Sequence, residues 1–517
     1  MLAGNLSTPV PSEELTVSSP GLSPTSTPDP RRWSMLAVTL VAMFMAIFDF
    51  YVINIATPSL QSQLHASQAT LELIIGGYTF TYASLLVFGG RLGDVFSYRR
   101  MFIVGMSLFT VSSLGCSVVA NGGQLVAVRL VQGAGAALMV PQVVALIQVS
   151  FPPPERPKAL SWFGATVGLA SVAGQILGGL LLTVDVANLG WRIIFLVNIP
   201  IGIVTVALAI RLLPDTRAQR RPRQDPVGTI GVSATLALAI LPLILGHSEG
   251  WPTWGWLMLA ASVPVALATI AYERALPARG GEPILAFDVM RTRSFAVGVL
   301  TIIGIMSLYA GFIFAMTLFL QAGLALDPLE AGLTFGPMGL GFAVSSLLAR
   351  PLLMKHGAKV ISAGQGMLVL GLVGLLVELN IYGTDTSAVR MLLPMLIAGL
   401  GTGLTIPSLT GIVVSQVPPH KAGLASGMLT TAQQFANTIG VAAFGAIFFD
   451  ALGDEPDLAR YVTALEWVAG VGIALSAVTL GLSFLLPQSG RSEQRLGRDR
   501  SARQGSGERP EALPEGS

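Results

Sequence analysis

Long apolar runs, each about 20 residues in length, alternate with short polar connections along almost the whole chain. A helix of that length spans the hydrocarbon core of a bilayer, where every backbone amide must be paired within the protein. The pattern therefore predicts an all-α integral membrane protein with about fourteen transmembrane helices. The predicted spans lie near residues 34–58, 71–90, 101–120, 124–148, 159–182, 192–213, 226–246, 254–275, 294–321, 329–354, 358–379, 389–416, 421–449 and 462–486.

Composition agrees with this pattern and excludes a soluble globular protein. The 517 residues are 52% apolar and 11% charged, with a mean hydropathy of +0.69, whereas soluble domains are about 25% charged. Residues 1–33 and 487–517 are polar and have no apolar run, so we expect two disordered tails. The only cysteine, Cys116, lies within a predicted span, which rules out an intrachain disulfide.

The basic residues are sorted by side, because they are concentrated in alternate connections between spans. Lys and Arg are enriched at the cytoplasmic ends of transmembrane helices. We therefore predict that both termini are cytoplasmic and that the chain lies in the cytoplasmic membrane, with no nucleic-acid partner. The even-numbered connections carry Arg91, Arg99, Arg100, Arg156, Lys158, Arg217, Arg220, Arg221, Arg223, Arg274, Arg279, Arg291, Arg293, Lys355, Lys359 and Lys421.

Asp49 lies within the first predicted span. A carboxylate inside the bilayer is unfavourable unless it faces a cavity, a partner or a proton, so Asp49 is a candidate functional residue. The alternative is a structural carboxylate that is hydrogen-bonded to a neighbouring helix near the outer interface. Asn54 follows five residues later, about 140° around the helix, and is a candidate to face the substrate cavity from another side.

Arg129 lies at the head of a stripe of small residues in the fourth predicted span, and Gln132 shares its face. Small residues allow neighbouring helices to approach closely. Because an arginine does not lose its charge at any relevant pH, Arg129 must find an acceptor or water. We predict that Arg129 and Asp49 are the proton-coupling pair, and that Gln132 faces the substrate cavity.

The segment 89–100 is predicted to be a charged loop between the second and third spans. It either fixes the orientation of the chain at the membrane surface or forms a charged latch between helices that move. The candidate latch residues are Gly90, Arg91, Asp94, Arg99 and Arg100.

Two further spans contain groups that suit a substrate cavity. Gln433, Gln434 and Asn437 share an uncharged polar face in the thirteenth span, and Tyr309 belongs to an aromatic stripe in the ninth. The stripe suits bulky apolar ligands, although ordinary lipid or core packing is the favoured explanation. Gln175 lies in a stripe of small residues in the fifth span, for which tight helix packing is the alternative.

Several of these segments, in this order, resemble motifs of the major facilitator superfamily, in particular its fourteen-helix branch of drug:proton antiporters. The segment from Gly90 to Arg100 is similar to the signature between helices two and three, and the surroundings of Asp49 and Arg129 resemble the first-helix and fourth-helix motifs. The resemblance implies two six-helix halves, 34–213 and 276–486. Between them it implies a linker and two additional helices, within 214–275.

The chain also departs from the family pattern. Val95 and Ser97 replace a basic residue and a glycine of the loop signature, and Gln175 replaces the proline of the fifth-helix antiporter motif. The second departure weakens the antiporter assignment without affecting the fold.

Nothing in the sequence predicts enzymatic chemistry or a cofactor. His65, His247, His356 and His420 have no metal-ligand spacing, and the glycine-rich stretches lack the lysine of a P-loop, so ATP is not the expected energy source. We predict a monomeric, proton-coupled exporter of small, largely hydrophobic organic compounds that works by alternating access. The alternatives are a metabolite importer or uniporter, and a membrane sensor or scaffold that has kept the fold without transport.

Overall fold

The computed structural model describes residues 30–152, 155–184, 188–215, 225–246, 249–279, 281, 283, 287–415, 417, 422–453 and 456–486. The predicted tails, apart from residues 30–33, lie outside this part of the chain. So do the basic cluster 217–223, Lys421, His247 and His420.

The described residues form helices that agree with the sequence prediction. Fourteen helices are long and apolar enough to cross a membrane. Ten of these spans are single α-helices, and four contain two or three helical elements. The principal elements are α1 (Arg32–Leu64), α2 (Gln68–Phe96), α3 (Tyr98–Val118), α4 (Gly122–Ser150), α5 (Arg156–Val184), α6 (Ile193–Leu196), α7 (Asn198–Leu212), α8 (Pro226–Leu245), α9 (Thr253–Ala275), α10 (Phe287–Met290), α11 (Arg293–Leu318), α12 (Pro328–Thr334), α13 (Gly336–His356), α14 (Lys359–Tyr382), α15 (Ala388–Ser415), α16 (Ala422–Leu452) and α17 (Leu458–Ser483).

Two spans are interrupted where a proline removes a backbone donor. Pro200 cannot donate to the carbonyl of Leu196, and α6 ends there, while α7 begins at Asn198. Pro337 lies at the equivalent position beyond the break between α12 and α13. A third composite span is α11, which continues as a π-helical turn over Phe319–Gly323, and a fourth is α14, which is followed by a 3-10 turn over Gly383–Asp385. After the first break, α7 begins with a buried polar side chain, that of Asn198.

The predicted loop over residues 89–100 is wrong. Helix α2 continues to Phe96, and only Ser97 separates it from α3. The helix extends this far because its glycines pack closely against α4: a Cβ atom added at Gly89 would collide with the carbonyl oxygen of Ala137. The charged residues of the segment therefore occupy the last turns of α2 and the first turn of α3.

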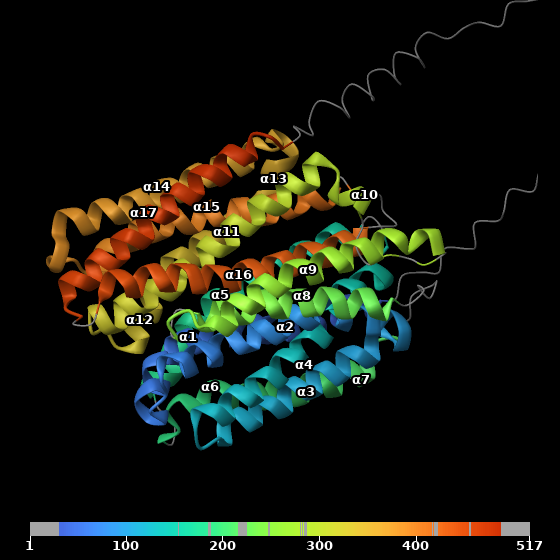
Figure 1. Cartoon of the computed structure of the whole chain (residues 1–517), viewed down its shortest axis with the longest axis horizontal. Helices are drawn as coiled ribbons and strands as arrows, with labels where there is room; N and C mark the ends of the chain where they lie inside the picture. Colours follow the sequence, from blue (N-terminus) through green and yellow to red (C-terminus); the bar gives the residue numbers. More distant parts are fainter. Residues whose placement is uncertain are drawn as a thin grey trace, which may run out of the picture.

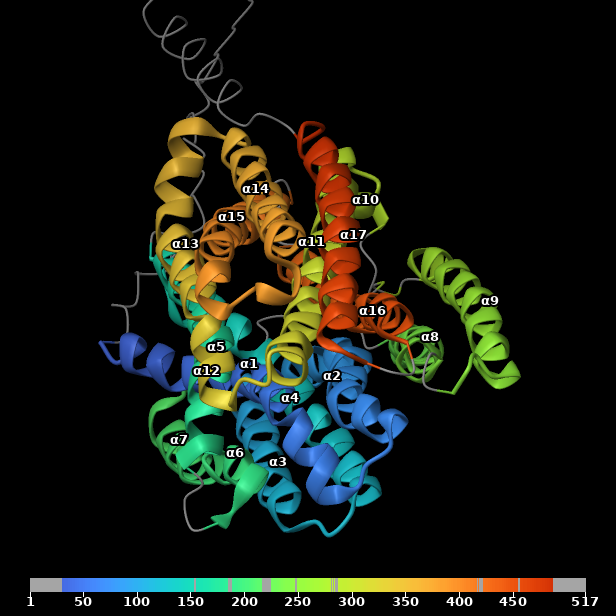
Figure 2. The ribbon, with the colours of Figure 1, turned by 90° about the vertical axis from the view of Figure 1, so that its left-hand side faces the viewer.

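The two sets of six spans pack in the same pattern. In the first set, α4 packs against α2 and α3, and α1 packs against α5; in the second, α15 packs against α13 and α14, and α11 packs against α16. Figures 1 and 2 show the two sets as separate layers, one above the other. This equivalence is typical of transporters that are built from repeated halves.

Helices α8 and α9 lie to one side of both sets (Figure 2). Helix α8 packs against α2 of the first set and α16 of the second, while α9 packs mainly against α8. The additional pair therefore closes a seam between the two sets, and α9 forms its outer edge.

The closest contacts between the two sets lie along α5, where it meets α12 and α13. Cβ atoms added at Gly179 and at Gly332 would collide with backbone of the opposite set, and one added at Gly168 would collide with the ring of Phe342. Closer to the start of α5, an added Cβ atom at Gly164 would lie in open space, and Trp162 is 54% exposed. The tightest inter-set packing is thus concentrated toward α12.

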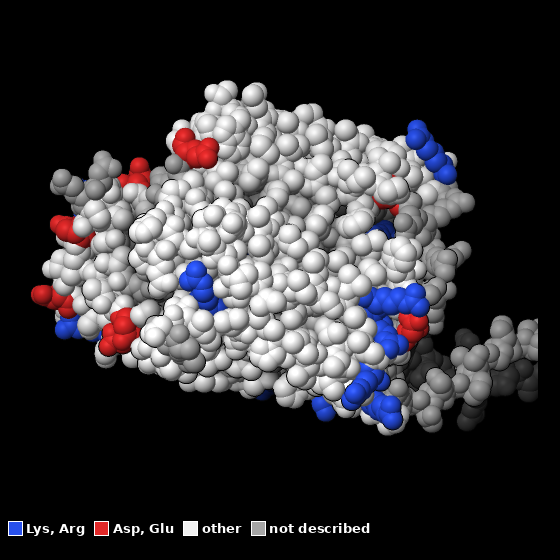
Figure 3. Space-filling view, turned by 90° about the horizontal axis from the view of Figure 1, so that it is seen from below, with Lys and Arg blue, Asp and Glu red and all other residues white. Residues whose placement is uncertain are grey.

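Charged residues on the surface are sorted along the length of the spans. On the face shown in Figure 3, most Lys and Arg side chains gather at one end and most Asp and Glu side chains at the other. This sorting of charge is consistent with the predicted orientation.

The start of α1 lies at the turn between α4 and α5. Trp33 contacts the ring of Phe151 there, with 5.1 Å between the ring centroids.

Candidate functional site

A buried ion pair joins the middle of α1 to α4. A terminal nitrogen of Arg129 donates a hydrogen bond to Oδ2 of Asp49, and both side chains are completely buried. The sequence predicted that these residues act together, and the structure brings them into direct contact. A buried pair of this kind is costly to disrupt from one side, because the remaining charge is left in a low-dielectric interior.

Neutral polar groups from α3, α4 and α7 complete the surroundings of the carboxylate. Oδ1 of Asp49 accepts hydrogen bonds from Gln132 Nε2 at 2.9 Å and from Asn198 Nδ2 at 3.2 Å. Both amides also donate to the hydroxyl oxygen of Ser113, at 2.9 and 3.4 Å. The five residues Asp49, Ser113, Arg129, Gln132 and Asn198 are referred to below as the ion-pair cluster.

Arg129 has several contacts besides Asp49. Its Nε donates to the carbonyl oxygen of Ile74 at 3.1 Å, and Nη1 also donates to Gln132 Oε1 at 2.8 Å. The guanidinium carbon lies 4.5 Å from the centroid of the Tyr78 ring, within the range of a cation–π interaction. These contacts exist because α2 and α4 approach closely at Gly133, where an added Cβ atom would collide with the carbonyl of Tyr78.

Asp49 and Arg129 each have polar partners besides one another. Asp49 is an acceptor from three side chains when ionised, and it would become a donor if protonated. Arg129 keeps its charge, so protonation of Asp49 would remove its ionic partner, and the guanidinium already donates to two other acceptors, Ile74 O and Gln132 Oε1. The geometry also fits the alternative of a structural carboxylate, since every Asp49 bond goes to a neighbouring helix.

Sequence reasoning missed two members of the ion-pair cluster, Ser113 and Asn198. Asn198 could have been recognised from Asn-Ile-Pro at the entry of the sixth span, where Pro200 interrupts the helix. Ser113 had no distinguishing signal, because a lone serine within a span usually bonds to its own backbone. Gln132 was predicted to face the substrate cavity, and the structure places it in the ion-pair cluster, where its amide is occupied by Asp49, Ser113 and Arg129.

Three other residues predicted for the substrate cavity lie in α1, α5 and α11. The hydroxyl groups of Tyr309 and Ser171 are 3.4 Å apart, and the ring of Tyr309 lies 6.2 Å from that of Tyr51. These contacts join the two sets of spans. Gln175 and Asn54 are buried; the Asn54 amide donates to the carbonyl of Phe50 at 3.1 Å, and neither polar atom of the Gln175 side chain has a hydrogen bond within the described residues.

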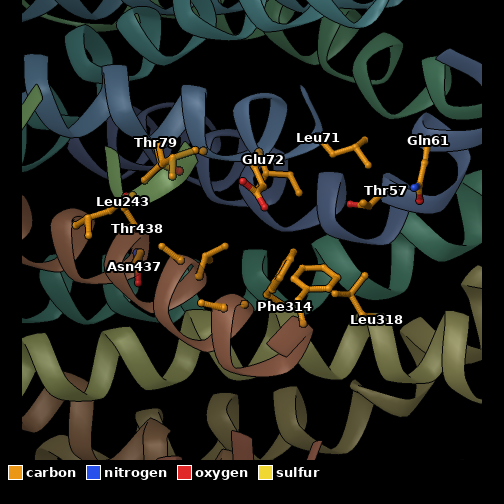
Figure 4. Close-up of a pocket in the computed structure, with 18 of the residues that line it drawn as sticks. Thr57, Gln61, Leu71, Glu72, Thr79, Leu243, Phe314, Leu318, Asn437 and Thr438 are labelled. Atoms are coloured by element: carbon orange, nitrogen blue, oxygen red, sulfur yellow. The ribbon is translucent and has the colours of Figure 1, made fainter. Parts of the chain in front are cut away.

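The remaining predicted cavity residues, Gln433, Gln434 and Asn437, lie on α16. Asn437 Nδ2 donates to Gln434 Oε1 at 3.2 Å. Asn437 also lines a cavity of about 280 Å³ between α1, α2, α8, α11, α16 and α17. Figure 4 shows this cavity, with Glu72 of α2 directed into it. Glu72 was not among the residues singled out from the sequence.

The candidate latch residues make contacts within the first set of spans. Asp94 Oδ1 accepts a hydrogen bond from the Tyr98 hydroxyl at 3.0 Å, and Arg99 donates to the carbonyl oxygen of Ile210 in α7. Arg100 pairs with Asp215 at 3.5 Å, but both side chains are largely exposed. Gly90 makes only an ordinary contact with Pro141, whereas its neighbours Gly89 and Gly93 lie against α4.

The arrangement of two equivalent six-span sets around buried polar groups defines the chain as a membrane transporter fold. Residues 39–441 match the sequence model of the Major Facilitator Superfamily. The chain belongs to this family.

Several relatives resemble the chain along most of its length. It is 36% identical to a probable actinorhodin transporter of Streptomyces coelicolor, over 86% of this chain and 78% of the relative. It is 33% identical to the puromycin resistance protein pur8 of Streptomyces alboniger, over 81% and 82%. It is 31% identical to the cephamycin export protein CmcT of Amycolatopsis lactamdurans, over 88% and 93%.

Solved structures agree on the fold. A crystal structure of an auto-inhibited peptide transporter of the POT family superposes with a TM-score of 0.62 over 88% of this chain and 96% of the other. The two sequences are 16% identical, so the likeness concerns the arrangement of helices.

Proposed function

We propose that this protein is a monomeric, proton-coupled exporter of small, largely hydrophobic organic compounds across the cytoplasmic membrane, with both termini in the cytoplasm. The observation that carries the proposal is the fully buried contact between Asp49 and Arg129 in a chain of this family. The names of the relatives, which refer to actinorhodin, puromycin and cephamycin, support efflux of bulky organic molecules.

The ion-pair cluster provides the coupling element. With Asp49 ionised, Arg129 is held against it; with Asp49 protonated, the attraction is lost and Arg129 turns to the Ile74 carbonyl and the Gln132 amide. The two arrangements favour different packings of α1 against α4. Proton binding from outside and release to the cytoplasm would then be tied to the two states of alternating access.

The conformation of the chain supports a cytoplasm-facing state. The tight contacts of α5 with α12 and α13 lie toward the end that is proposed to face outside, and packing is looser near Gly164. Tyr309 and Gln175 lie on the route between the halves and are proposed to contact the substrate as it passes. The segment from Gly90 to Arg100 is proposed to stabilise one of the two states through its contacts with α7.

The test is proton release on addition of substrate to purified protein. Puromycin and hydroxylated anthraquinones are added to detergent-solubilised protein in weak buffer, and the released protons are measured with a pH indicator. We expect release from the wild type and none from Asp49→Asn. The matched control is Asp385→Asn, which neutralises an exposed carboxylate in an outer connection. Equal release from Asp49→Asn and wild type would remove Asp49 from the proton path.

Transport of the same compounds distinguishes export from import and from uniport. In proteoliposomes with an imposed pH gradient, an antiporter accumulates substrate against its own gradient only when protons flow in the opposite direction. Equilibration without accumulation, whatever the pH gradient, would instead indicate a uniporter, and accumulation in the same direction as the protons would indicate an importer.

A further inference from the structure

The cavity between the two sets of spans lies apart from the ion-pair cluster. It is lined by residues of α1, α2, α8, α11, α16 and α17, and none of the five members of the cluster is among them. Helix α8 closes its side: Ile244 lies against Gly76, where an added Cβ atom would be only 2.8 Å from the Ile244 side chain. The additional helix pair therefore creates a wall that the two sets alone would lack.

The lining of this cavity favours a positively charged ligand. Of the described residues that line the cavity, Glu72 is the only one with a charged side chain. Figure 4 shows its carboxylate directed toward the interior, facing Phe314. Glu72 lies four residues after the start of α2, about 6 Å along the helix axis, so the charge is near one end of the span. A carboxylate that lines a mainly apolar cavity attracts a cation more strongly than it would in bulk water.

Aromatic and neutral polar groups complete the site. Phe314 and Phe449 pack edge to face with their centroids 6.4 Å apart, and the Tyr461 ring forms another part of the lining. Ring faces attract organic cations, and quaternary ammonium groups are recognised by aromatic rings in this way. Gln61 and Asn437 supply amides, while most of the remaining lining is apolar. A mainly apolar pocket with a few polar groups is typical of small-molecule sites.

We infer that this cavity is a binding site for an organic cation with an apolar body, and that Glu72 is its counter-ion. The inference goes beyond the proposed function, because it requires neither proton coupling nor a direction of transport. The cation could be a soluble compound or the ammonium headgroup of a lipid, which share the chemistry that the site recognises.

Binding of a matched pair of fluorescent probes tests the inference. The cation is N-methyl dimethylaminostyrylpyridinium, and the neutral probe is its demethylated parent, dimethylaminostyrylpyridine, which has nearly the same shape. Binding to the purified full-length protein is measured at equilibrium in maltoside micelles by fluorescence anisotropy, without any ion gradient. The wild type is expected to bind the cation about tenfold more tightly than the neutral probe, since one partly desolvated charge contact is worth about 1.4 kcal/mol.

Three variants separate charge from shape. Glu72→Gln is expected to weaken the cation about tenfold and leave the neutral probe unchanged, whereas Glu72→Asp keeps most of the preference. Ala442→Phe fills the cavity without changing any charge and should weaken both probes. The control is Glu466→Gln, which neutralises another partly buried carboxylate within a span, outside the cavity lining. Size-exclusion profiles and thermal melting verify that each variant is folded.

The outcomes are distinct. Equal affinity of Glu72→Gln and wild type for the cation, in folded protein, would overturn the inference, as would equal weakening by Glu466→Gln. Displacement of the dye by added phosphatidylethanolamine would support the site with a lipid as its source, and retention would support a soluble cation. Asp49→Asn separates this inference from the proposed function. If that variant loses proton release and still binds the dye, the proton path and the cation site have been tested independently.

Discussion

The buried contact between Asp49 and Arg129 makes a prediction about stability that is separate from transport. Replacing Arg129 by Met removes the cation and leaves Asp49 completely buried, with amide donors from Gln132 and Asn198 only. Breaking one partner of a buried ion pair costs about 3–5 kcal/mol. Because two neutral donors remain, we expect a value near the lower end, about 3 kcal/mol.

Replacement of Asp49 is also expected to destabilise the protein, but the effects of the two replacements are not expected to add in the double variant. Asp49→Leu alone leaves an arginine buried without its carboxylate and should also be strongly destabilising. In the double variant both charges are gone, and replacement of a buried pair by apolar residues is often neutral or stabilising by about 1–4 kcal/mol. We therefore expect the double variant to be more stable than either single variant, with a coupling of at least about 3 kcal/mol.

The assay is a double-mutant cycle on purified protein, with the fraction folded followed by tryptophan fluorescence in increasing denaturant in detergent micelles. Proton release on substrate addition is measured on the same four samples. The double variant is expected to be folded and stable but inactive. Additive destabilisation would refute the energetic coupling of the pair, and proton-coupled transport by a stable double variant would refute its role in the mechanism.

Three further predictions follow from separate parts of the structure. Gly89→Val should abolish folded yield, because the added side chain collides with backbone of α4, whereas Gly90→Ala should be tolerated; size-exclusion yield measures both. A Gly250→Cys variant should react with an impermeant thiol reagent on intact cells, and labelling only after lysis would reverse the proposed orientation. The Arg32 hydrogen bond lowers the pKa of Glu155 from its ordinary 4.5, so this contact contributes stability above that pH and loses it as the pH falls through the lowered pKa. The melting difference between wild type and Arg32→Gln should therefore be small and constant near neutrality and shrink below about pH 4.5, and a difference that grows in acid would contradict this.

The spans and the central ion pair could be predicted from the sequence for a simple physical reason. A bilayer requires long apolar helices, and a charge within such a helix is conspicuous because it needs a specific partner. Asp49 and Arg129 were both recognised in this way. Their neutral partners were not, since Ser113 and Asn198 carry no charge that would make them stand out, and only the packing of α3 and α7 against α1 brings them to Asp49.

Two errors have causes that are equally specific. The segment 89–100 was predicted as a loop because its charges suggested water, but Gly89 and Gly93 allow α2 to continue alongside α4. Glu72 was overlooked because the second span was predicted to begin at residue 71, where a charge suggests an interface. The structure begins α2 at Gln68 and directs Glu72 into a cavity that depends on α8. The cavity exists only because α8 packs beside α2, and the sequence of α2 alone does not predict this contact.

The carboxylates of Asp49 and Glu72, both in the first set, differ in what surrounds them, and this difference bears on how a proton and a cation could share one transport cycle. Asp49 is enclosed by donors from its own set of spans, whereas Glu72 faces a cavity whose walls come from both sets and α8. Phe50, the residue after Asp49, lines that cavity. A rotation of α1 that accompanies release of Arg129 would therefore also move Phe50 in the cavity wall. If both proposals hold, the proton and the organic cation would not compete for one carboxylate and would be linked through α1, because each binding event would favour its own position of the same helix.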